Sequence, residues 1–296
     1  MPETEFLIFE VLNYLLFAGC VWHAHRQGKT RLLELLVSVL YGVFLEWMTI
    51  QQLEAYQYGH FLVMVDGAPL CIGLGWAVII YSGMEFVRLL EMPDFARPFL
   101  VGFMALNLDL AMDVVAIRLG FWNWVIPMDA EWFGVPWGNF WAWYIVVVSY
   151  SGLLYWLRAL GWHLPRQTWR QWVYAPLAMA GSVVILALAN AIFANVFAKT
   201  EIVSAMSMLL LLLVGMVVVY VARPRFSVPA RLDWPVFAVP LVFHLYFNFI
   251  GFWNGYYLQL PVLAVVGMLM LALGIGIHFG CWYFPMKEQK NKLQTV

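Results

Sequence analysis

The sequence predicts an all-α, polytopic membrane protein, built as a bundle of about nine transmembrane helices. The chain of 296 residues is 64% hydrophobic and only 11% charged, with a mean hydropathy of +0.80. That composition excludes an ordinary soluble domain. A membrane-spanning helix needs about 20 apolar residues, and apolar segments of this length follow one another along almost the whole chain.

We predict spanning helices at residues 6–24, 32–52, 69–90, 98–118, 139–160, 172–197, 202–222, 235–254 and 257–281. The connections are too short to separate two folded domains, so residues 1–296 form a single integral-membrane domain. The first segment follows the acidic stretch Met1-Pro-Glu-Thr-Glu. A signal peptide would be basic there, so this segment is expected to stay as a helix.

The basic residues predict the orientation. Of the 16 Lys and Arg residues, all but Arg118 and Lys199 fall in connections on the same side of a nine-helix bundle. Because cytoplasmic loops collect positive charge, the N-terminus is expected outside and the C-terminus inside. The expected location is a multi-pass position in the plasma (inner) membrane.

The acidic residues Glu46, Asp109 and Asp113 lie within long apolar stretches. A carboxyl group is costly in hydrocarbon, so an acid inside a membrane marks a functional site by default. Asp109 and Asp113 are four residues apart and share one helical face. Two carboxyls that close do not readily both ionise in a low dielectric, so at least one is expected to keep its proton near neutral pH. The alternative is a structural role, in which these acids hold helices together.

A possible internal repeat has an offset of 67 residues. Gly67-Ala68-Pro69 aligns with Gly134-Val135-Pro136, Trp76 with Trp143, and Glu46 with Asp113. The second and third helices would then form one hairpin, and the fourth and fifth a parallel copy of it, related by an axis along the membrane normal. This arrangement would place Glu46 and Asp113 at equal depth, facing a shared space. The aromatic loops at 53–68 and 119–138 are expected to cap it.

Other polar and aromatic side chains could face the same space. His244 and Asn248 share a face of the eighth helix, Asn139 opens the fifth, and Asn190 is expected to link helices. Tyr56, Tyr58 and His60 lie in the first aromatic loop, and Trp122, Trp124, Trp132, Trp137, Trp141 and Trp143 crowd the second loop and the helix after it. Indole faces stabilise cations. A neutral acid among tryptophans suits carbocation chemistry on an alkene.

At these residues the chain resembles the integral-membrane carotenoid 1,2-hydratases, which include gamma-carotene 1′-hydratases and bisanhydrobacterioruberin hydratases. The resemblance covers about residues 40–145. It rests on Glu46, Tyr58-Gly59-His60, Gly67-x-Pro69, Gly75-Trp76, Asp109-x-x-x-Asp113, Trp122-x-Trp124, Phe133-Gly134-Val135-Pro136 and Asn139-Phe140-x-x-Trp143.

The resemblance implies a hydro-lyase that adds water to the terminal C1=C2 double bond of an acyclic carotenoid without a cofactor or a metal. Asp113 or Asp109 would protonate C2, and Glu46 would orient or deprotonate the water that adds at C1. The remaining candidates would bind the substrate: Tyr58, His60, Trp76, Trp122, Trp124, Asn139, Trp143, His244 and Asn248. The expected partners are a lipophilic polyene or isoprenoid and the lipid bilayer, with no nucleic acid.

Other classes of protein remain open. Proton-coupled transporters also use acids inside the membrane, and a carotenoid-binding protein or an isoprenoid cyclase would need a similar cavity. A prenyltransferase would need a second aspartate-rich motif to hold Mg²⁺ and diphosphate, and this sequence has only Asp109-x-x-x-Asp113. A di-iron oxygenase would need clustered histidines, whereas His23-x-His25 is predicted on the inner side, away from the other four histidines, and the sequence has no HxxHH run.

Overall fold

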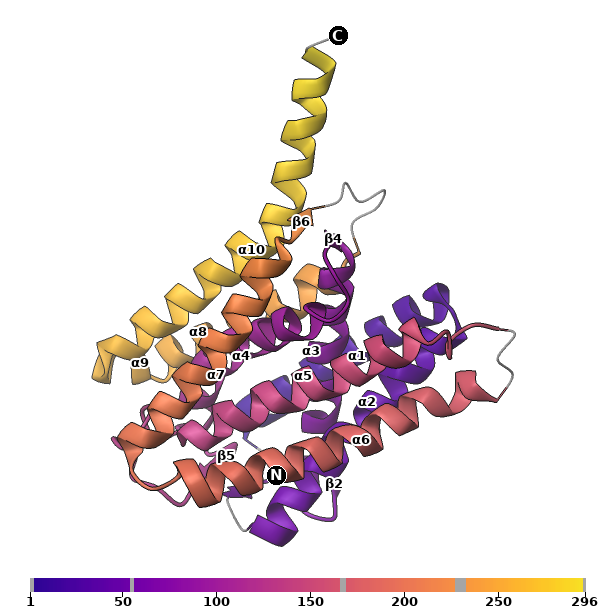
Figure 1. Ribbon diagram of the computed structural model, residues 1–296. Coiled ribbons are helices and arrows are strands. Elements are labelled where there is room, and N and C mark those ends of the chain that lie inside the picture. The colour runs from indigo at the N-terminus through magenta and orange to yellow at the C-terminus, as the bar shows by residue number, and fades with distance from the viewer. Residues whose placement is uncertain (1–2, 54–55, 166–168, 227–232, 295–296) are drawn as a thin grey trace.

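The computed structural model describes residues 3–53, 56–165, 169–226 and 233–294, and within them nine helices are long and apolar enough to cross a membrane (Figure 1). The predicted all-α polytopic bundle is therefore confirmed. The helices are α1 (Thr4–Gln27), α2 (Lys29–Met48), α3 (Leu70–Arg88), α4 (Arg97–Ala116), α5 (Trp137–Ala159), α6 (Arg170–Ile192), α7 (Glu201–Ala222), α8 (Pro235–Trp253), α9 (Tyr256–Gln259) and α10 (Pro261–Gln294). Two π-helical turns continue them, η1 (Thr49–Leu53) after α2 and η2 (Phe193–Phe197) after α6.

The last predicted helix, at 257–281, starts later than expected. The short helix α9 ends at Gln259, and α10 begins at Pro261. Leu260 between them is extended, with φ −135° and ψ 83°. Proline disfavours a helical conformation in the residue before it and fits the first position of a helix, so Pro261 separates the two.

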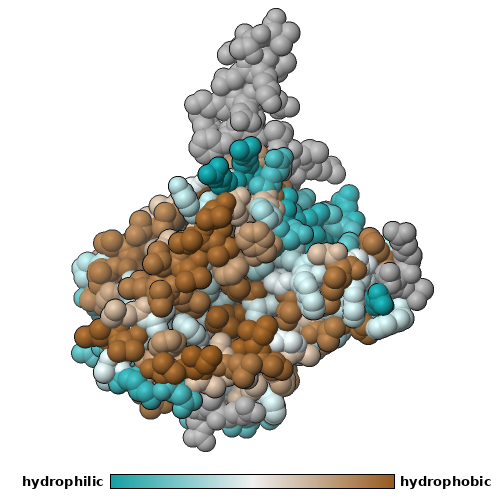
Figure 2. All heavy atoms as spheres, viewed as in Figure 1, coloured by the Kyte–Doolittle hydropathy of each residue, from teal (hydrophilic) through white to brown (hydrophobic). Residues whose placement is uncertain are grey.

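The bundle has a buried centre and an apolar outer surface. In α3, 89% of the spanning window is buried, and in α4 72%, whereas the corresponding values are 17% for α6 and 22% for α7 and for α10. Figure 2 shows hydrophobic side chains over most of the visible side of the bundle and hydrophilic ones gathered towards its ends. The acids of α2 and α4 therefore lie among protein side chains rather than in lipid.

Short strands mark the two ends of the bundle (Figure 1). At one end β4 (Leu90–Glu91) pairs with β6 (Arg225–Phe226), close to Arg88, and we call this the basic end. At the other, the aromatic end, β1 (Tyr56–Tyr58) pairs with β5 (Trp122–Trp124), and β2 (Met64–Val65) with β3 (Ala68–Pro69). Arg166, Arg231 and the side chains of the tail lysines, which the orientation prediction also used, lie outside the described residues.

The repeat predicted at an offset of 67 recurs in the backbone. The bridge Val65↔Ala68 has its counterpart in Trp132↔Val135, followed in each copy by the helix that starts after the proline. Positive φ angles recur at Asp66 and Phe133, and at Gly67 (φ +88°) and Gly134 (φ +94°). The β1–β5 pairing is antiparallel, as expected for two equivalent strands that meet across a twofold axis. The axis of the repeat therefore runs through the aromatic end, between the two hairpins.

Candidate active site

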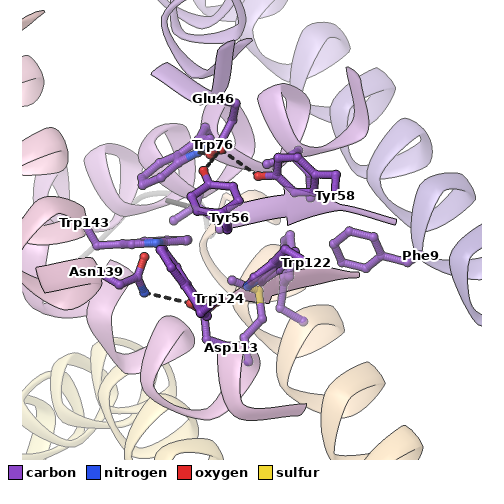
Figure 3. A pocket seen from close by; sticks show the side chains of 15 residues that line it. Phe9, Glu46, Tyr56, Tyr58, Trp76, Asp113, Trp122, Trp124, Asn139 and Trp143 are labelled. Atoms are coloured by element: carbon purple, nitrogen blue, oxygen red, sulfur yellow. Dashed lines mark hydrogen bonds between the residues drawn. The ribbon is translucent and has the colours of Figure 1, made fainter. Parts of the chain in front are cut away.

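A cavity of about 470 Å³ lies at the aromatic end of the bundle, where the two hairpins meet α1 and α8 (Figure 3). Glu46 lines it on one side, and Asp113 on the other. The side chains that line it are those of Phe9, Glu46, Tyr56, Tyr58, Ile72, Trp76, Ile79, Met112, Asp113, Trp122, Trp124, Asn139, Trp143 and Phe243, together with Gly75. The cavity thus combines two acids from equivalent positions of the repeat with a largely aromatic wall.

Glu46 is buried at the end of α2 and accepts three hydrogen bonds. The Tyr58 hydroxyl, 2.6 Å away, and the Tyr56 hydroxyl both donate to Oε2, and the Trp76 indole N–H donates to Oε1 at 2.6 Å. An indole N–H can only donate a hydrogen bond, and an ionised carboxylate can only accept one. Three donors directed at one carboxyl group offset part of the cost of burying a negative charge there, and no lysine or arginine pairs with it among the described residues.

The hydroxyl groups of the two tyrosines that bind Glu46 keep their protons and so remain hydrogen-bond donors. Burial raises the pKa of both Tyr56 and Tyr58 well above the usual value for a phenol, and the negative charge of Glu46 raises it further. Both hydroxyls therefore stay protonated over the physiological pH range.

The β1–β5 ribbon explains why these aromatic residues converge. Alternate residues of a strand share one face, so Tyr56 and Tyr58 point the same way, as do Trp122 and Trp124. The register places Tyr56 opposite Trp124 and Tyr58 opposite Trp122, with ring centroids 4.6 and 6.0 Å apart. The ribbon covers the end of the cavity, as predicted for the two aromatic loops.

Asp109 and Asp113 form a pair on one face of α4, as the four-residue spacing predicts. Asn139, at the start of α5, donates to Asp113 Oδ2 at 2.7 Å and to Asp109 Oδ2 at 3.3 Å. Asn139 thus bridges the two carboxyl groups, and the Oδ1 atom of each is buried without a hydrogen-bond partner among the described residues. Two carboxyl groups held this close in a low dielectric do not readily both ionise, which favours a proton on the pair. Asp113 lines the cavity, whereas Asp109 lies behind it and is fully buried.

Three further acids are buried in the bundle, and sequence reasoning did not single them out. Glu34 is bound by Arg158 and Arg31, and Glu85 by Arg88. Glu10 accepts the backbone N–H groups of residues 62 and 63 and so holds the first aromatic loop. Glu46 and the aspartate pair differ from Glu34 and Glu85 because no arginine or lysine neutralises them in the described residues.

Three of the predicted substrate-binding residues lie away from the cavity. His60 is exposed in the first aromatic loop. His244 is 2.9 Å from the Asn107 amide oxygen, and Asn248 donates to the backbone of His244. The face that His244 and Asn248 share is turned towards α4 and α10, so these residues join helices instead of lining the cavity.

Sequence reasoning missed two aromatic residues of the wall, Phe9 of α1 and Phe243 of α8. Both are phenylalanines in ordinary apolar helices, and no local pattern distinguishes them from lipid-facing residues. Asn190, expected to link helices, makes no side-chain hydrogen bond to another described residue and lines a second groove instead. Within the described part of the chain, no three His, Cys, Asp or Glu side chains come together as a metal site would require.

The fold and the cavity define a class: a polytopic membrane protein with a buried aspartate pair and an aromatic pocket within the bundle. The chain belongs to the carotenoid biosynthesis protein family, whose sequence pattern matches residues 6–214. The match includes both hairpins and every cavity residue except Phe243. Searches of curated proteins and of solved structures found no match.

Proposed function

We propose that this protein hydrates the terminal C1=C2 double bond of an acyclic carotenoid end, giving a tertiary alcohol. The family supports a role in carotenoid biosynthesis, and the cavity supports this particular reaction. The observation that carries the proposal is the arrangement of two unlike acid sites across one cavity: an aspartate pair held by Asn139, and Glu46 held by two tyrosines and Trp76, with indole rings between them.

Asp113 is the proton donor in this proposal. It is the member of the aspartate pair that lines the cavity, and its neighbour Asp109 shares the proton and positions it. The Asp113 proton forms a bond to C2, and the π electrons of the alkene supply that bond. The positive charge then lies at tertiary C1, next to the faces of Trp76, Trp124 and Trp143. Indole rings stabilise such a cation through their negative faces and do not trap it.

Water completes the reaction from the Glu46 side. Its oxygen forms a bond to C1, and one of its protons passes to the Glu46 carboxylate. The indole N–H of Trp124 is buried without an acceptor among the described residues, so it is available to hold this water. One proton is taken from the aspartate pair and one is given to Glu46, and return of that proton through water restores the starting state. Apart from the carotenoid, the reaction consumes only water.

We also infer an orientation in the membrane from the charges. The basic end carries Arg31, Arg88 and Arg158 and would face the cytoplasm of a plasma (inner) membrane by the positive-inside rule. The cavity would then lie near the outer leaflet, where a lipophilic polyene can reach it.

The direct test uses the full chain, purified in detergent, with an acyclic carotenoid in water enriched in heavy oxygen. We expect a product that gains the mass of a water molecule, with the label in a tertiary alcohol and no requirement for an added cofactor or an ion gradient. A cyclic isomer with no mass gain would identify a cyclase instead. Unchanged pigment in detergent, with gradient-driven uptake in vesicles, would identify a transporter.

Amide variants then test the roles of the acids. General acid catalysis contributes roughly 10²–10⁴-fold, so Asp113→Asn should lower the hydration rate by about that factor. Asp109→Asn should cost less, because Asp109 does not line the cavity, and Glu46→Gln should slow the water step. Glu34→Gln is the matched control, an acid held by arginines outside the cavity. Full activity in all three cavity variants would refute the mechanism.

A further inference from the structure

A second hollow lies beside the candidate active site, at the side of the bundle. It is a groove of about 1220 Å³ between α2, α5 and α6, and it has six lining side chains in common with the cavity. The shared residues are Glu46, Tyr56, Trp76, Trp124, Asn139 and Trp143. The two hollows are therefore neighbours separated by no more than one layer of side chains.

The groove opens at the outer surface of the bundle, where α6 passes into η2. Val125 at the rim is 83% exposed, and Ala194 of η2 is exposed as well. The α6 surface next to this mouth carries the exposed side chains of Leu188 and Ile192, which suit contact with lipid tails. A molecule that enters the groove from the bilayer would therefore reach Glu46 without crossing the polar surface of the protein.

The lining of the groove beyond the shared residues fits a hydrocarbon chain. It consists of small or apolar side chains except for Thr49 and Asn190. The Asn190 amide has no side-chain partner among the described residues. Asn190 is only half-buried, so its amide is open to a bound molecule or to water in the groove.

Both π-helical turns border the groove. Thr49 belongs to η1, and Phe193 and Ala194 belong to η2. Single π-helical turns are rare and occur frequently at functional sites. Gly138 lets α5 approach η2 closely, since a Cβ there would lie 2.9 Å from the Phe193 ring. The mouth of the groove is thus formed by the two π-helical turns η1 and η2 and by the close packing of α5 on η2.

We propose that this groove binds the long hydrocarbon chain of the substrate while the reacting end lies in the cavity, and that the substrate enters laterally from the membrane between α2 and α6. This inference rests on the proposed hydration and adds the binding site that selects for chain length. The cavity between Glu46 and Asp113 receives only the reacting end, and the rest of a long polyene must leave it along an apolar path.

The test fills the groove without touching the acids. Ala142 of α5 lines the groove but not the cavity, so Ala142→Phe would block the path of the chain. Ala187→Phe is the matched control, because Ala187 is exposed on α6 and lines neither hollow. Ala194→Trp, at the exposed rim, provides a second blocking variant that leaves the packed interior unchanged.

Two substrates separate the possible outcomes: a long acyclic carotenoid, and a short acyclic terpene hydrocarbon with the same dimethyl-substituted terminal double bond. We expect Ala142→Phe and Ala194→Trp to lower kcat/KM for the carotenoid by at least about tenfold, which corresponds to 1.4 kcal/mol of binding. Turnover of the short terpene should be unchanged. Equal effects on both substrates, or on neither, would overturn the inference and leave the hydration proposal intact.

Binding gives a readout that does not depend on turnover. A polyene bound in the groove lies beside Trp124 and Trp143 and should quench tryptophan fluorescence, and Ala142→Phe should weaken this quenching while Ala187→Phe does not. If the wild type hydrates neither substrate but shows this pattern of quenching, the proposed function fails and the groove stands. Equal quenching in all variants would refute the proposal that the groove binds the polyene chain.

Discussion

Trp76 and Trp143 pack against each other at the aromatic end of the bundle, with ring centroids 4.0 Å apart and planes tilted by 34°. They are equivalent residues of the repeat, 67 positions apart, and their contact lies between the two hairpins. Trp76 also donates to Glu46, and both rings line the cavity and the groove. One pair of side chains therefore joins the symmetry of the fold to the chemistry of the site.

The first prediction concerns Trp143 as a wall for the cation. Trp143→Phe keeps an aromatic face with a weaker quadrupole, and Trp143→Leu removes the face. Cation–π contacts contribute roughly 0.5–2 kcal/mol, so kcat should fall by a few-fold to about thirtyfold, and further for Leu than for Phe. Single-turnover hydration rates measure the effect. Trp156→Phe, at an exposed residue of α5 outside the cavity, is the control. Equal rates in Phe and Leu variants would contradict the assignment.

The second prediction concerns the phenols that hold Glu46. The pKa of Tyr58 is raised well above the usual 10.0, so the native state keeps this proton at a pH where the unfolded chain releases it. Its contribution to the free energy of unfolding is complete below pH 10 and declines above it. Phenolate absorbance during alkaline titration should therefore be the same in wild type and Tyr58→Phe up to the usual tyrosine range. An extra phenolate in the wild type within that range would disprove this.

The third prediction concerns a buried acid with a structural role. Glu34 is held by Arg158, which forms an ion pair with it, and by the Tyr174 hydroxyl at 2.6 Å. Glu34→Gln leaves a buried guanidinium without its counter-charge, and the expected loss in the free energy of unfolding is roughly 3–5 kcal/mol. Thermal unfolding in detergent measures it. The double variant Glu34→Gln/Arg158→Met should recover much of the loss. Activity per folded molecule should not change, in contrast to the Glu46 variants.

The fourth prediction concerns the two glycines before the repeated prolines. Gly67 and Gly134 both have positive φ, which costs an L-residue roughly 1–2 kcal/mol. A Cβ at Gly67 would meet no atom closer than 3.9 Å, whereas one at Gly134 would lie 3.0 Å from Ile117 and Met128. Gly134→Ala should therefore destabilise the protein more than Gly67→Ala. Gly276→Ala is the control, since Gly276 lies in α10 with no atom within 4 Å of an added Cβ. Thermal unfolding compares the three, and equal losses at Gly67 and Gly134 would disagree with this geometry.

Much of the fold can be read from the chain because spanning a membrane is a local property. A stretch of about 20 apolar residues specifies a helix wherever it lies in the bundle. The spacing of Asp109 and Asp113 likewise specifies that they share a face, since four residues make about one helical turn. The offset of 67 residues likewise pairs Glu46 with Asp113 within the sequence itself.

What each polar side chain binds was decided by tertiary structure alone. Glu34 and Glu46 lie in the same helix and look alike in sequence, yet one contacts arginine and the other phenols and an indole. His244 and Asn248 share a face as predicted, but α10 packs on that face, so neither residue lines the cavity. A periodic pattern shows which side chains point together; which helix they meet depends on long-range packing, and so does the groove that α6 completes.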